Sequence, residues 1–314
     1  MLGRTAQNLF WLSRYVERAE NMARLLEVGY RMSLTSRREG GASEPLMSMM
    51  QAAEIDEEFE RKHEVADVAT VSNFMLFDED NPSSLKACLT AARTNARSVR
   101  TKITSDVWQT INSAYLEFLQ LKPRDVTGAR LTELLQWMRQ VSHQYRGAML
   151  STILRDDGYA FSQLGNFIER ADNTARILDM KYYVLLPSAT LVGGEIDIQQ
   201  WTLILRAASA HRSYRHVYHD RYKAWNIADY LILRPEMPRS LAFCVGWINR
   251  TLDMLESIYG REEAVHAAAD QVTELVVGNT MDRIFGYGLH EFLTEFIDRN
   301  NRITDTLSES YNFY

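Results

Sequence analysis

The sequence predicts an all-α fold, a multi-helix bundle, on three observations. Apolar residues recur with a period of about 3.6, and no convincing run of strands with a period of two is found. Only 15 glycines and 6 prolines occur in 314 residues, so long segments are uninterrupted. A segment near the N-terminus returns in the middle of the chain. We therefore expect one domain, 1–314, made of two related halves of about 1–155 and 156–314 with an internal pseudo-twofold duplication.

Helices of the first half follow from periodicity and from local start and stop signals. In the first helix Leu12, Val16, Ala19, Ala23 and Leu26 share one face, which other helices must cover. The segment Ser36 to Pro45 reads as a loop, Asn81-Pro82-Ser83-Ser84 as a turn into a helix, and Thr104 or Ser105 as an N-cap. The expected helices span residues 5–34, 46–62, 64–76, 83–102, 105–121 and 128–154.

In the second half, Asp156-Asp157-Gly158 marks a break before the next helix, and Leu186 to Gly194 forms the longest loop. Pro235 and Pro238 interrupt a later pair of helices. The expected helices span residues 159–185, 196–219, 224–233, 239–259 and 262–309, which brings the bundle to about ten to twelve helices. Three of the last four residues, 311–314, are aromatic, so we expect this tail to dock, either near Phe10 and Trp11 or on another chain.

Composition limits the partners and the compartment. The net charge is −6, with 35 basic and 41 acidic residues, which gives no reason to expect binding to nucleic acid or to an anionic membrane. No apolar run approaches the roughly 20 residues of a membrane span, and the N-terminus enters an amphipathic helix, so a cytoplasmic location is expected by exclusion. Cys88 and Cys244 lie far apart and are expected to be buried thiols.

The internal repeat is the most informative feature. Residues 15–26 (YVERAENMARLL) match residues 167–178 (FIERADNTARIL) at a constant offset of 152 (169 − 17). In each copy the polar residues recur at i, i+3, i+4 and i+7, which places them on one helical stripe. These stripes are Glu17, Glu20, Asn21 and Arg24 in the first copy and Glu169, Asp172, Asn173 and Arg176 in the second. One such stripe is typical of a solvated face, but its persistence in both copies makes a ligand site or a structural ion network an equal alternative.

A second charged stripe consists of Arg93, Arg97 and Arg100, at i, i+4 and i+7 of the helix after Asn81-Pro82. Like charges at this spacing repel unless a partner neutralises them. We expect at least one of these arginines to pair with the acidic stripes, although an anionic ligand held in bidentate fashion and plain solvent exposure both remain open.

Familiar catalytic and cofactor signatures are not found. Gly286-Tyr287-Gly288 lacks the other glycines of a dinucleotide loop, and neither a P-loop nor a nucleophile elbow occurs. His216 and His219, near His211 and Asp220, are spaced for a metal but share their helix with Arg212 and Arg215. Glu17 and Glu20 could hold Mg²⁺ only against the charge of Arg18 and Arg24. The sequence therefore predicts no metal and no cofactor.

Several segments together resemble the bacterial alpha-E domain proteins across essentially the whole chain. They are 8–21 (NLFWLSRYVERAEN), 81–84 (NPSS), 92–100 (ARTNARSVR), 167–173 (FIERADN), 229–233 (DYLIL), 238–244 (PRSLAFC) and 311–314 (YNFY). The family is named for its helical character and its Glu-containing motif and is a domain of unknown function. The resemblance implies the company of circularly permuted ATP-grasp proteins and transglutaminase-like peptidases, encoded beside the domain or fused to it. It supplies no catalytic residue.

Two functional hypotheses follow. The first is a helical accessory or interaction subunit of an ATP-grasp amidoligase or peptide-modifying system, with an ATP-grasp or transglutaminase-like protein as partner. The second is an enzyme whose site lies between the halves, with Glu17 and Glu169 as acid and base and with Arg24, Arg93 and Arg176 holding an anionic, amino-acid-like or peptide substrate. The sequence leaves open whether catalysis occurs, and it does not exclude a homo-oligomer.

Overall fold

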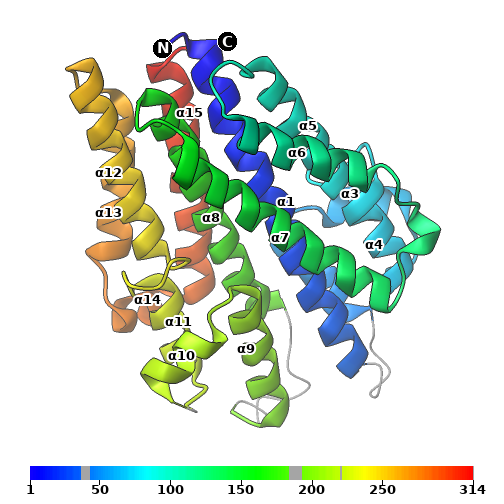
Figure 1. Ribbon diagram of the computed structural model, residues 1–314. Helices are drawn as coiled ribbons and strands as arrows, with labels where there is room; N and C mark the ends of the chain where they lie inside the picture. Colours follow the sequence, from blue (N-terminus) through cyan, green and yellow to red (C-terminus); the bar gives the residue numbers. More distant parts are fainter. Residues whose placement is uncertain (37–42, 184–192, 220, 314) are drawn as a thin grey trace.

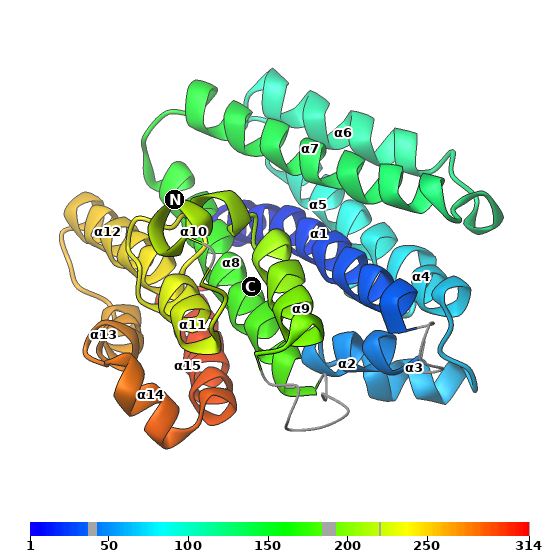
Figure 2. The same ribbon diagram turned by 90° about the horizontal axis from the view of Figure 1, so that it is seen from below.

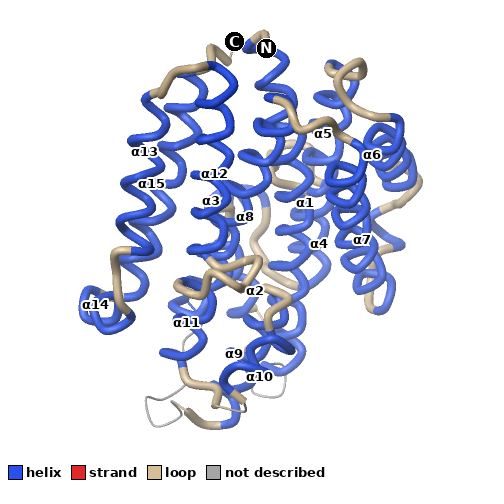
Figure 3. The backbone as a smooth tube through the Cα atoms, turned by 60° about the vertical axis from the view of Figure 1, so that its left-hand side comes forward, coloured by secondary structure: helices blue, strands red, loops and turns tan. Residues whose placement is uncertain are grey.

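A computed structural model describes residues 1–36, 43–183, 193–219 and 221–313. These residues form fifteen α-helices and one short 3-10 helix and no strand, as the tube in Figure 3 shows. The predicted all-α class is therefore confirmed. The helices are α1 (Gly3–Ser36), α2 (Glu44–Ala52), α3 (Asp56–Lys62), α4 (Val68–Phe77), α5 (Leu85–Ser98), α6 (Ser105–Phe118), α7 (Ala129–Thr152), α8 (Asp157–Tyr183), α9 (Glu195–Ala207), α10 (His211–Tyr218), α11 (Ala224–Ile232), α12 (Leu241–Tyr259), α13 (Ala264–Val277), α14 (Met281–Tyr287) and α15 (Leu289–Ser310).

The long helices α1 and α8 pack against each other at the centre of the molecule (Figure 1). Helix α1 also packs against α5 and α7, and α6 packs against both of these helices. Helix α8 also packs against α12 and α15, and α13 packs on these two. Figure 2 shows the two groups on opposite sides of the central pair. The expectation that the helices carrying Glu17 and Glu169 lie close together is confirmed.

Helix α1 is buried on its polar side as well as on its apolar side. The predicted apolar face is buried, with Leu12, Val16 and Ala19 all at most 1% exposed. The polar stripe, which would face solvent on an ordinary surface helix, is buried too. Helices α7, α8 and α9 cover this side of α1. A long helix that is covered all round must satisfy its charges inside the protein.

A glycine permits the close approach of the central pair. A Cβ atom on Gly165 of α8 would overlap the carbonyl oxygen of Phe10 on α1 and would lie 3.0 Å from its carbonyl carbon. Any side chain at this position forces the two backbones apart, since a backbone carbonyl has no rotamer with which to move aside.

Several helices begin at a side-chain N-cap, and the predicted cap at Thr104 is one of them. Thr104 is the N-cap of α6, and its hydroxyl accepts from the Val107 amide. Ser84 caps α5 by accepting from the Ala87 amide at 3.1 Å, and Ser240 caps α12 by accepting from the Phe243 amide at 3.0 Å. Each of these caps satisfies one amide that the first helical turn leaves without a partner.

Three expected helices are broken in the structure. The segment 46–62 divides at Glu54 (φ 55°), and 196–219 divides at Ser209 (φ 54°), because these residues adopt a left-handed conformation that a helix does not tolerate. The segment 262–309 divides into α13, α14 and α15 at Gly278 and at Gly288 (φ 118°). Single left-handed residues are hard to predict from periodicity because the apolar pattern continues across them.

The C-terminal tail docks as expected, on the first helix. Tyr311 and Phe313 are 9% and 8% exposed. The ring of Phe313 lies 5.7 Å from that of Phe10 and 6.0 Å from that of Phe161, and Tyr311 meets Phe161 edge-on at 5.0 Å. The tail therefore joins α1 to α8 at one end of the bundle.

Replacing Phe313 by alanine should lower the free energy of unfolding by about 1.5–3 kcal/mol, because a buried aromatic ring returns to water. Chemical denaturation followed by circular dichroism measures this. Tyr287→Ala is the matched control, since that ring is already 60% exposed and its loss should change stability little. Equal stability of Phe313→Ala and the parent would mean that the tail contributes nothing to the bundle.

No helix in the described ranges is both long enough and apolar enough to cross a membrane. Most of the loop expected over Leu186 to Gly194, Arg37 and Arg38 of the earlier loop, and Asp220 and Tyr314 lie outside the described residues.

Candidate functional site

The two repeated helices bind each other through reciprocal ion pairs. Arg170 on α8 donates from Nε to Glu17 Oε1 on α1 at 3.1 Å. Arg18 on α1 donates from Nε to Glu169 Oε1 on α8 at 2.6 Å and from Nη2 to Oε2 at 3.0 Å. Adjacent Glu and Arg residues on one helix thus pair crosswise with the same two residue types on the other.

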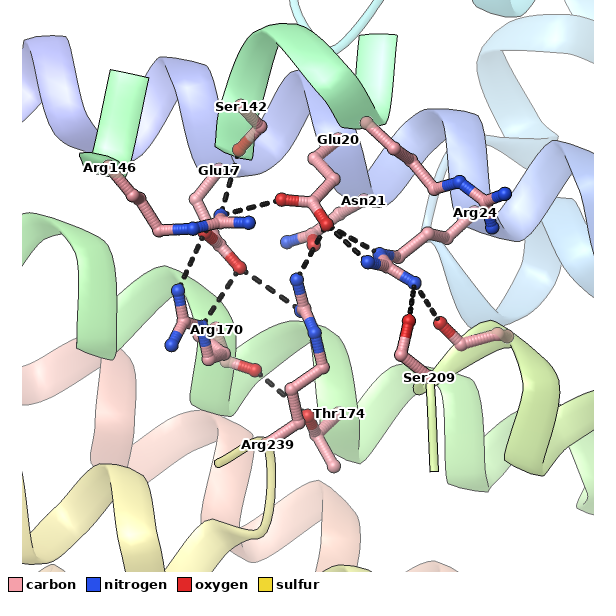
Figure 4. Close-up of polar contacts among 12 residues, drawn as sticks. Glu17, Glu20, Asn21, Arg24, Ser142, Arg146, Arg170, Thr174, Ser209 and Arg239 are labelled. Atoms are coloured by element: carbon pink, nitrogen blue, oxygen red, sulfur yellow. Dashed lines mark hydrogen bonds and ion pairs between the residues drawn. The ribbon is translucent and has the colours of Figure 1, made fainter. Parts of the chain in front are cut away.

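Around Glu17 and Glu20 these contacts widen into a buried cluster with four arginines (Figure 4). Arg146 Nη1 lies 2.6 Å from Glu17 Oε2 and 2.6 Å from Glu20 Oε2. Arg239 Nη1 lies 3.1 Å from Glu17 Oε1, and its Nη2 lies 2.7 Å from Glu20 Oε1. Both carboxylates are at most 1% exposed. All the ion pairs of each carboxylate are with guanidinium groups of this cluster.

Arg24, 1% exposed, connects this cluster to the break between α9 and α10. It donates to Glu20 from Nε at 2.8 Å, a pair of residues at i and i+4 of the first polar stripe. Its Nη1 donates to the carbonyl oxygen of Ala207 at 2.6 Å and to the hydroxyl of Ser209 at 2.8 Å. The left-handed Ser209 ends α9 where its last carbonyl can accept from this buried arginine.

Glu169 has a cluster of its own. Arg14 donates from Nε to Glu169 Oε2 at 2.7 Å and from Nη1 to the hydroxyl of Thr304 on α15 at 2.9 Å. The side-chain amide of Asn21 donates to the Glu169 carbonyl oxygen at 3.4 Å. The core contacts between α1, α8 and α15 are therefore charged as well as apolar.

These ion pairs set the protonation of the carboxylates. Burial alone raises the pKa of Glu17, but the charges of Arg170, Arg146 and Arg239 lower it to about 2. For Glu169 burial is likewise outweighed, here by Arg18 and Arg14, and its pKa also falls to about 2. The pKa of Glu20 lies well below its ordinary value because Arg239, Arg24 and Arg146 outweigh burial. None of these groups can hold a proton near neutral pH.

Acid should therefore destabilise the protein. A carboxyl group whose pKa is lower in the folded state stabilises it above the unfolded value, 4.5, and loses this contribution as the pH falls toward about 2. At neutral pH the lowered pKa of Glu17 and that of Glu169 each contribute on the order of 3 kcal/mol to the free energy of unfolding. Denaturation at pH 7, 4 and 3 should show that the free energy of unfolding falls steadily below pH 4.5.

Asp80→Asn is the control, because the Asp80 carboxylate forms an ion pair but is 81% exposed, and this variant should show the same dependence on pH as the parent. Constant stability from pH 7 to 3 would exclude the buried network.

The stripe of Arg93, Arg97 and Arg100 does not join the acidic stripes, contrary to expectation. Helix α5 buries Leu85, Cys88, Leu89, Ala92 and Ala96. The arginines lie on another side of α5, where Arg97 and Arg100 are exposed. Arg93 Nε donates to Asn112 Oδ1 at 2.9 Å, and its guanidinium lies 4.8 Å from the ring of Tyr115, while that of Arg100 lies 5.5 Å from the ring of Trp108. Aromatic faces of α6, rather than carboxylates, receive these charges.

The second polar stripe borders a small polar pocket of about 260 Å³. Asp172 accepts from Arg176 Nε at 2.8 Å, and Arg176 Nη1 also lies 3.0 Å from Glu54 Oε1. Asn173 is 2% exposed, and neither atom of its side-chain amide has a partner among the described residues. The pocket is lined by Arg18, Asn21, Met22, Ala53, Glu54, Ile55, Glu58, Pro82, Ser83, Glu169, Asp172, Asn173 and Arg176.

A second pocket, of about 220 Å³, borders the Glu17 cluster, and we call it the cationic pocket. Two arginines of the cluster and several aromatic rings form its wall, and the rings of Phe167 and Trp247 stack at 5.3 Å. It is lined by Ser13, Tyr145, Arg146, Met149, Leu150, Tyr159, Gln163, Asn166, Phe167, Arg170, Pro238, Phe243 and Trp247.

The sequence reasoning missed Arg14, Arg146 and Arg239 as members of the network. Arg14 continues the stripe of Glu17 by one step of i−3, so helical spacing could have found it. Arg239 lies in a second, shorter repeat, in which residues 82–88 (PSSLKAC) match residues 238–244 (PRSLAFC) at an offset of 156 (240 − 84). In this alignment Arg239 takes the place of Ser83. No sequence signal marks Arg146, which reaches the cluster through the packing of α7 on α1.

Within the described ranges, no group of three or more His, Cys, Asp and Glu side chains is arranged to hold a metal ion. Glu17 and Glu20, considered above as ligands of Mg²⁺, face guanidinium groups instead. Cys88 and Cys244 are buried free thiols, and burial raises the pKa of each to about 12.

Comparison with known proteins agrees with this architecture. Residues 1–311 match the Alpha-E family, described as a predicted alpha-helical domain with a conserved ER motif. Over 292 residues the chain is 24% identical to an uncharacterized protein of Mycobacterium bovis, and it is equally similar to one of Mycobacterium tuberculosis. The match covers 87% of this chain and 32% of each relative, so the chain spans about a third of their length. No solved structure matches the chain.

Fold and site together define an all-helical protein whose two central helices are joined by buried Glu–Arg pairs. The chain belongs to the Alpha-E family. Glu17-Arg18 and Glu169-Arg170 are two ER dipeptides, and here they bind each other across the α1–α8 contact.

Proposed function

We propose that this chain is a helical accessory or interaction subunit of an ATP-grasp amidoligase or peptide-modifying system. The observation that carries the non-catalytic role is the state of Glu17, Glu20 and Glu169. All three are buried, and all three are bound by arginines that keep them ionised. A general acid or base needs a pKa near the working pH and access to a substrate, and these groups have neither.

The alternative, an enzyme with Glu17 and Glu169 as acid and base, is less well supported for the same reason. Arg24 is committed to Glu20 and to the end of α9, and Arg93 lies against α6, so these two are not placed to hold one substrate together. Arg176 borders the polar pocket and is paired with Asp172.

The nature of the partner is supported by the resemblance to alpha-E proteins, which implies ATP-grasp and transglutaminase-like neighbours. The mycobacterial relatives are also about three times as long as the matched region, which is consistent with a domain that works beside others. Arg97 and Arg100 leave an exposed positive stripe on α5 and the residues that follow it, which an acidic surface of a partner would fit.

Coexpression tests this proposal. The tagged chain is produced with a circularly permuted ATP-grasp protein, and separately with a transglutaminase-like protein, from the same bacterium. We expect one of them to coelute with it in size-exclusion chromatography and to be released by the double variant Arg97→Glu/Arg100→Glu. Light scattering separates a homo-oligomer from the 36.3 kDa monomer. Clean monomeric behaviour in the presence of both proteins would reject the proposal.

We also infer that the two halves, about 1–155 and 156–314, arose by duplication and are related by an approximate twofold axis. The crosswise pairing of Glu17 with Arg170 and of Arg18 with Glu169 supports this, since both pairs join positions equivalent at the 152-residue offset. The packing of α5 on α1 and of α12 on α8, each after a serine cap, supports it further. If each half is a structural unit, residues 1–155 and residues 156–314 expressed together as two chains should assemble into one folded complex. Two chains that remain separate and unfolded would count against the two halves being structural units.

A further inference from the structure

The Glu17 cluster holds more positive than negative charge. Arg24, Arg146, Arg170 and Arg239 surround only Glu17 and Glu20, and within the described part of the chain none of the four pairs with another carboxylate. The excess is two positive charges in a buried environment. Burial and the charge of Arg24 lower the pKa of Arg239 to about 10, against the attraction of both carboxylates. An additional anion at the cluster would be favoured electrostatically.

The excess charge meets solvent at the cationic pocket. Arg146 is 20% exposed and lines this pocket together with the more deeply buried Arg170. All hydrogen bonds recorded for Arg146 run through Nη1, so Nε and Nη2 have no partner among the described residues. Arg170 likewise uses Nε and Nη2 and leaves Nη1 without one. Two guanidinium groups with unused donors on one small cavity are suited to bind the oxygens of an anion.

The rest of the wall limits what the anion can be. The pocket contains no Asp or Glu among its lining residues, so no carboxylate there would neutralise the charge of an ammonium group. Phe167, Phe243 and Trp247 provide an aromatic surface, and Tyr145, Gln163 and Asn166 provide neutral hydrogen-bonding groups. The volume, about 220 Å³, is smaller than that of a typical drug-sized site and fits a ligand of the size of one amino-acid residue.

We propose that the cationic pocket is a binding site for a small monocarboxylate that carries an apolar, ring-sized body and no positive charge. Its carboxylate would bind to Arg146 and Arg170, and its body would pack on Phe167 and Trp247. An inorganic anion such as phosphate satisfies the guanidinium groups but leaves the aromatic wall unused. A free amino acid brings an ammonium group, which would lie near two arginines and would find no carboxylate in the pocket lining to neutralise it. The site does not depend on a protein partner, so it stands apart from the proposed accessory role.

Calorimetric titration of the full chain with three probes tests the chemistry. The probes are 3-phenylpropionate, its neutral amide, and inorganic phosphate. We expect 3-phenylpropionate to bind about tenfold or more tightly than either of the others, because only it uses both the charge and the apolar wall. Equal binding of the amide would overturn the role of the arginines, and equal binding of phosphate would overturn the role of the aromatic wall. Absence of binding of 3-phenylpropionate up to about 10 mM would overturn the site.

Variants assign the binding to this pocket. Arg146→Met should weaken 3-phenylpropionate binding about tenfold or more while leaving the weak binding of the amide unchanged. Trp247→Leu lies outside the ion network and should weaken the binding of 3-phenylpropionate and of its amide by the same factor. This variant tests the location of the site even if Arg146→Met folds poorly. Arg100→Met is the matched control, since it makes the same substitution at an exposed arginine that lies over the ring of Trp108 and does not line this pocket. Loss of binding in the control variant, or full binding in both pocket variants, would contradict the assignment.

Discussion

Replacing Glu20 by alanine should lower the free energy of unfolding by about 3–5 kcal/mol, which is among the largest effects of any single substitution in this chain. The carboxylate is fully buried and accepts from Arg24, Arg146 and Arg239. Its removal raises the excess of positive charge in the cluster from two to three, and three of the four arginines, Arg24, Arg170 and Arg239, are buried. Urea denaturation at pH 7 measures the loss.

Two further variants separate this mechanism from general damage to α1. Glu27→Ala removes a carboxylate from the same helix, but its partners Arg31 and Arg139 are 41% and 26% exposed, so a loss of about 0–1 kcal/mol is expected. Arg146→Met reduces the excess charge and should lower stability by only about 1–2 kcal/mol. If Glu20→Ala unfolds no more easily than Arg146→Met, the charge imbalance does not control stability.

Replacing Gly165 by alanine should destabilise the protein by about 3 kcal/mol or more. A new methyl group on α8 would overlap the backbone carbonyl of Phe10, and α1 and α8 would have to separate. Their separation also lengthens the ion pairs of Glu17 and Glu169, which are geometrically linked to this crossing. Thermal unfolding followed by circular dichroism should show a large fall in Tm.

Gly147→Ala is the matched control because it makes the same substitution inside α7, where nothing lies within 4 Å of the added Cβ. Alanine is the better helix former, so this variant should be more stable than the parent by about 0.5–1 kcal/mol. Opposite signs for the two substitutions are expected, and a gain of stability in both would show that the central helices tolerate a wider spacing.

The class of fold and the central helix pair could be predicted because both depend on local periodicity and on a repeat visible in the chain. The pairing of Glu20 with Arg24 follows from i, i+4 spacing alone. The breaks at Glu54 and Ser209 could not be predicted, since a left-handed residue is held there by tertiary contacts such as that of Arg24 with Ala207.

For the site, the sequence indicated the carboxylates and the i, i+4 arginines Arg24 and Arg176, but not the arginines that reach Glu17, Glu20 and Glu169 from elsewhere in the fold. Arg93, Arg97 and Arg100 form the more conspicuous stripe, yet they lie on the side of α5 turned away from α1. Arg146 and Arg239 come from a helix and a turn that only the packing of the chain brings to Glu17. The periodicity of a sequence shows which face of a helix is buried, but it does not show which other helices pack against that face.

The long separation of the paired residues has a consequence for synthesis. Arg239 follows Glu17 by 222 positions, so at about 5–20 residues per second Glu17 is synthesised about 10–40 s before Arg239. During that interval Glu17 and Glu20 lack Arg239, and charged residues next to apolar segments oppose aggregation of an incomplete chain. We therefore expect the carboxylates that complete the interior of the finished protein to reduce aggregation of the unfinished chain as well.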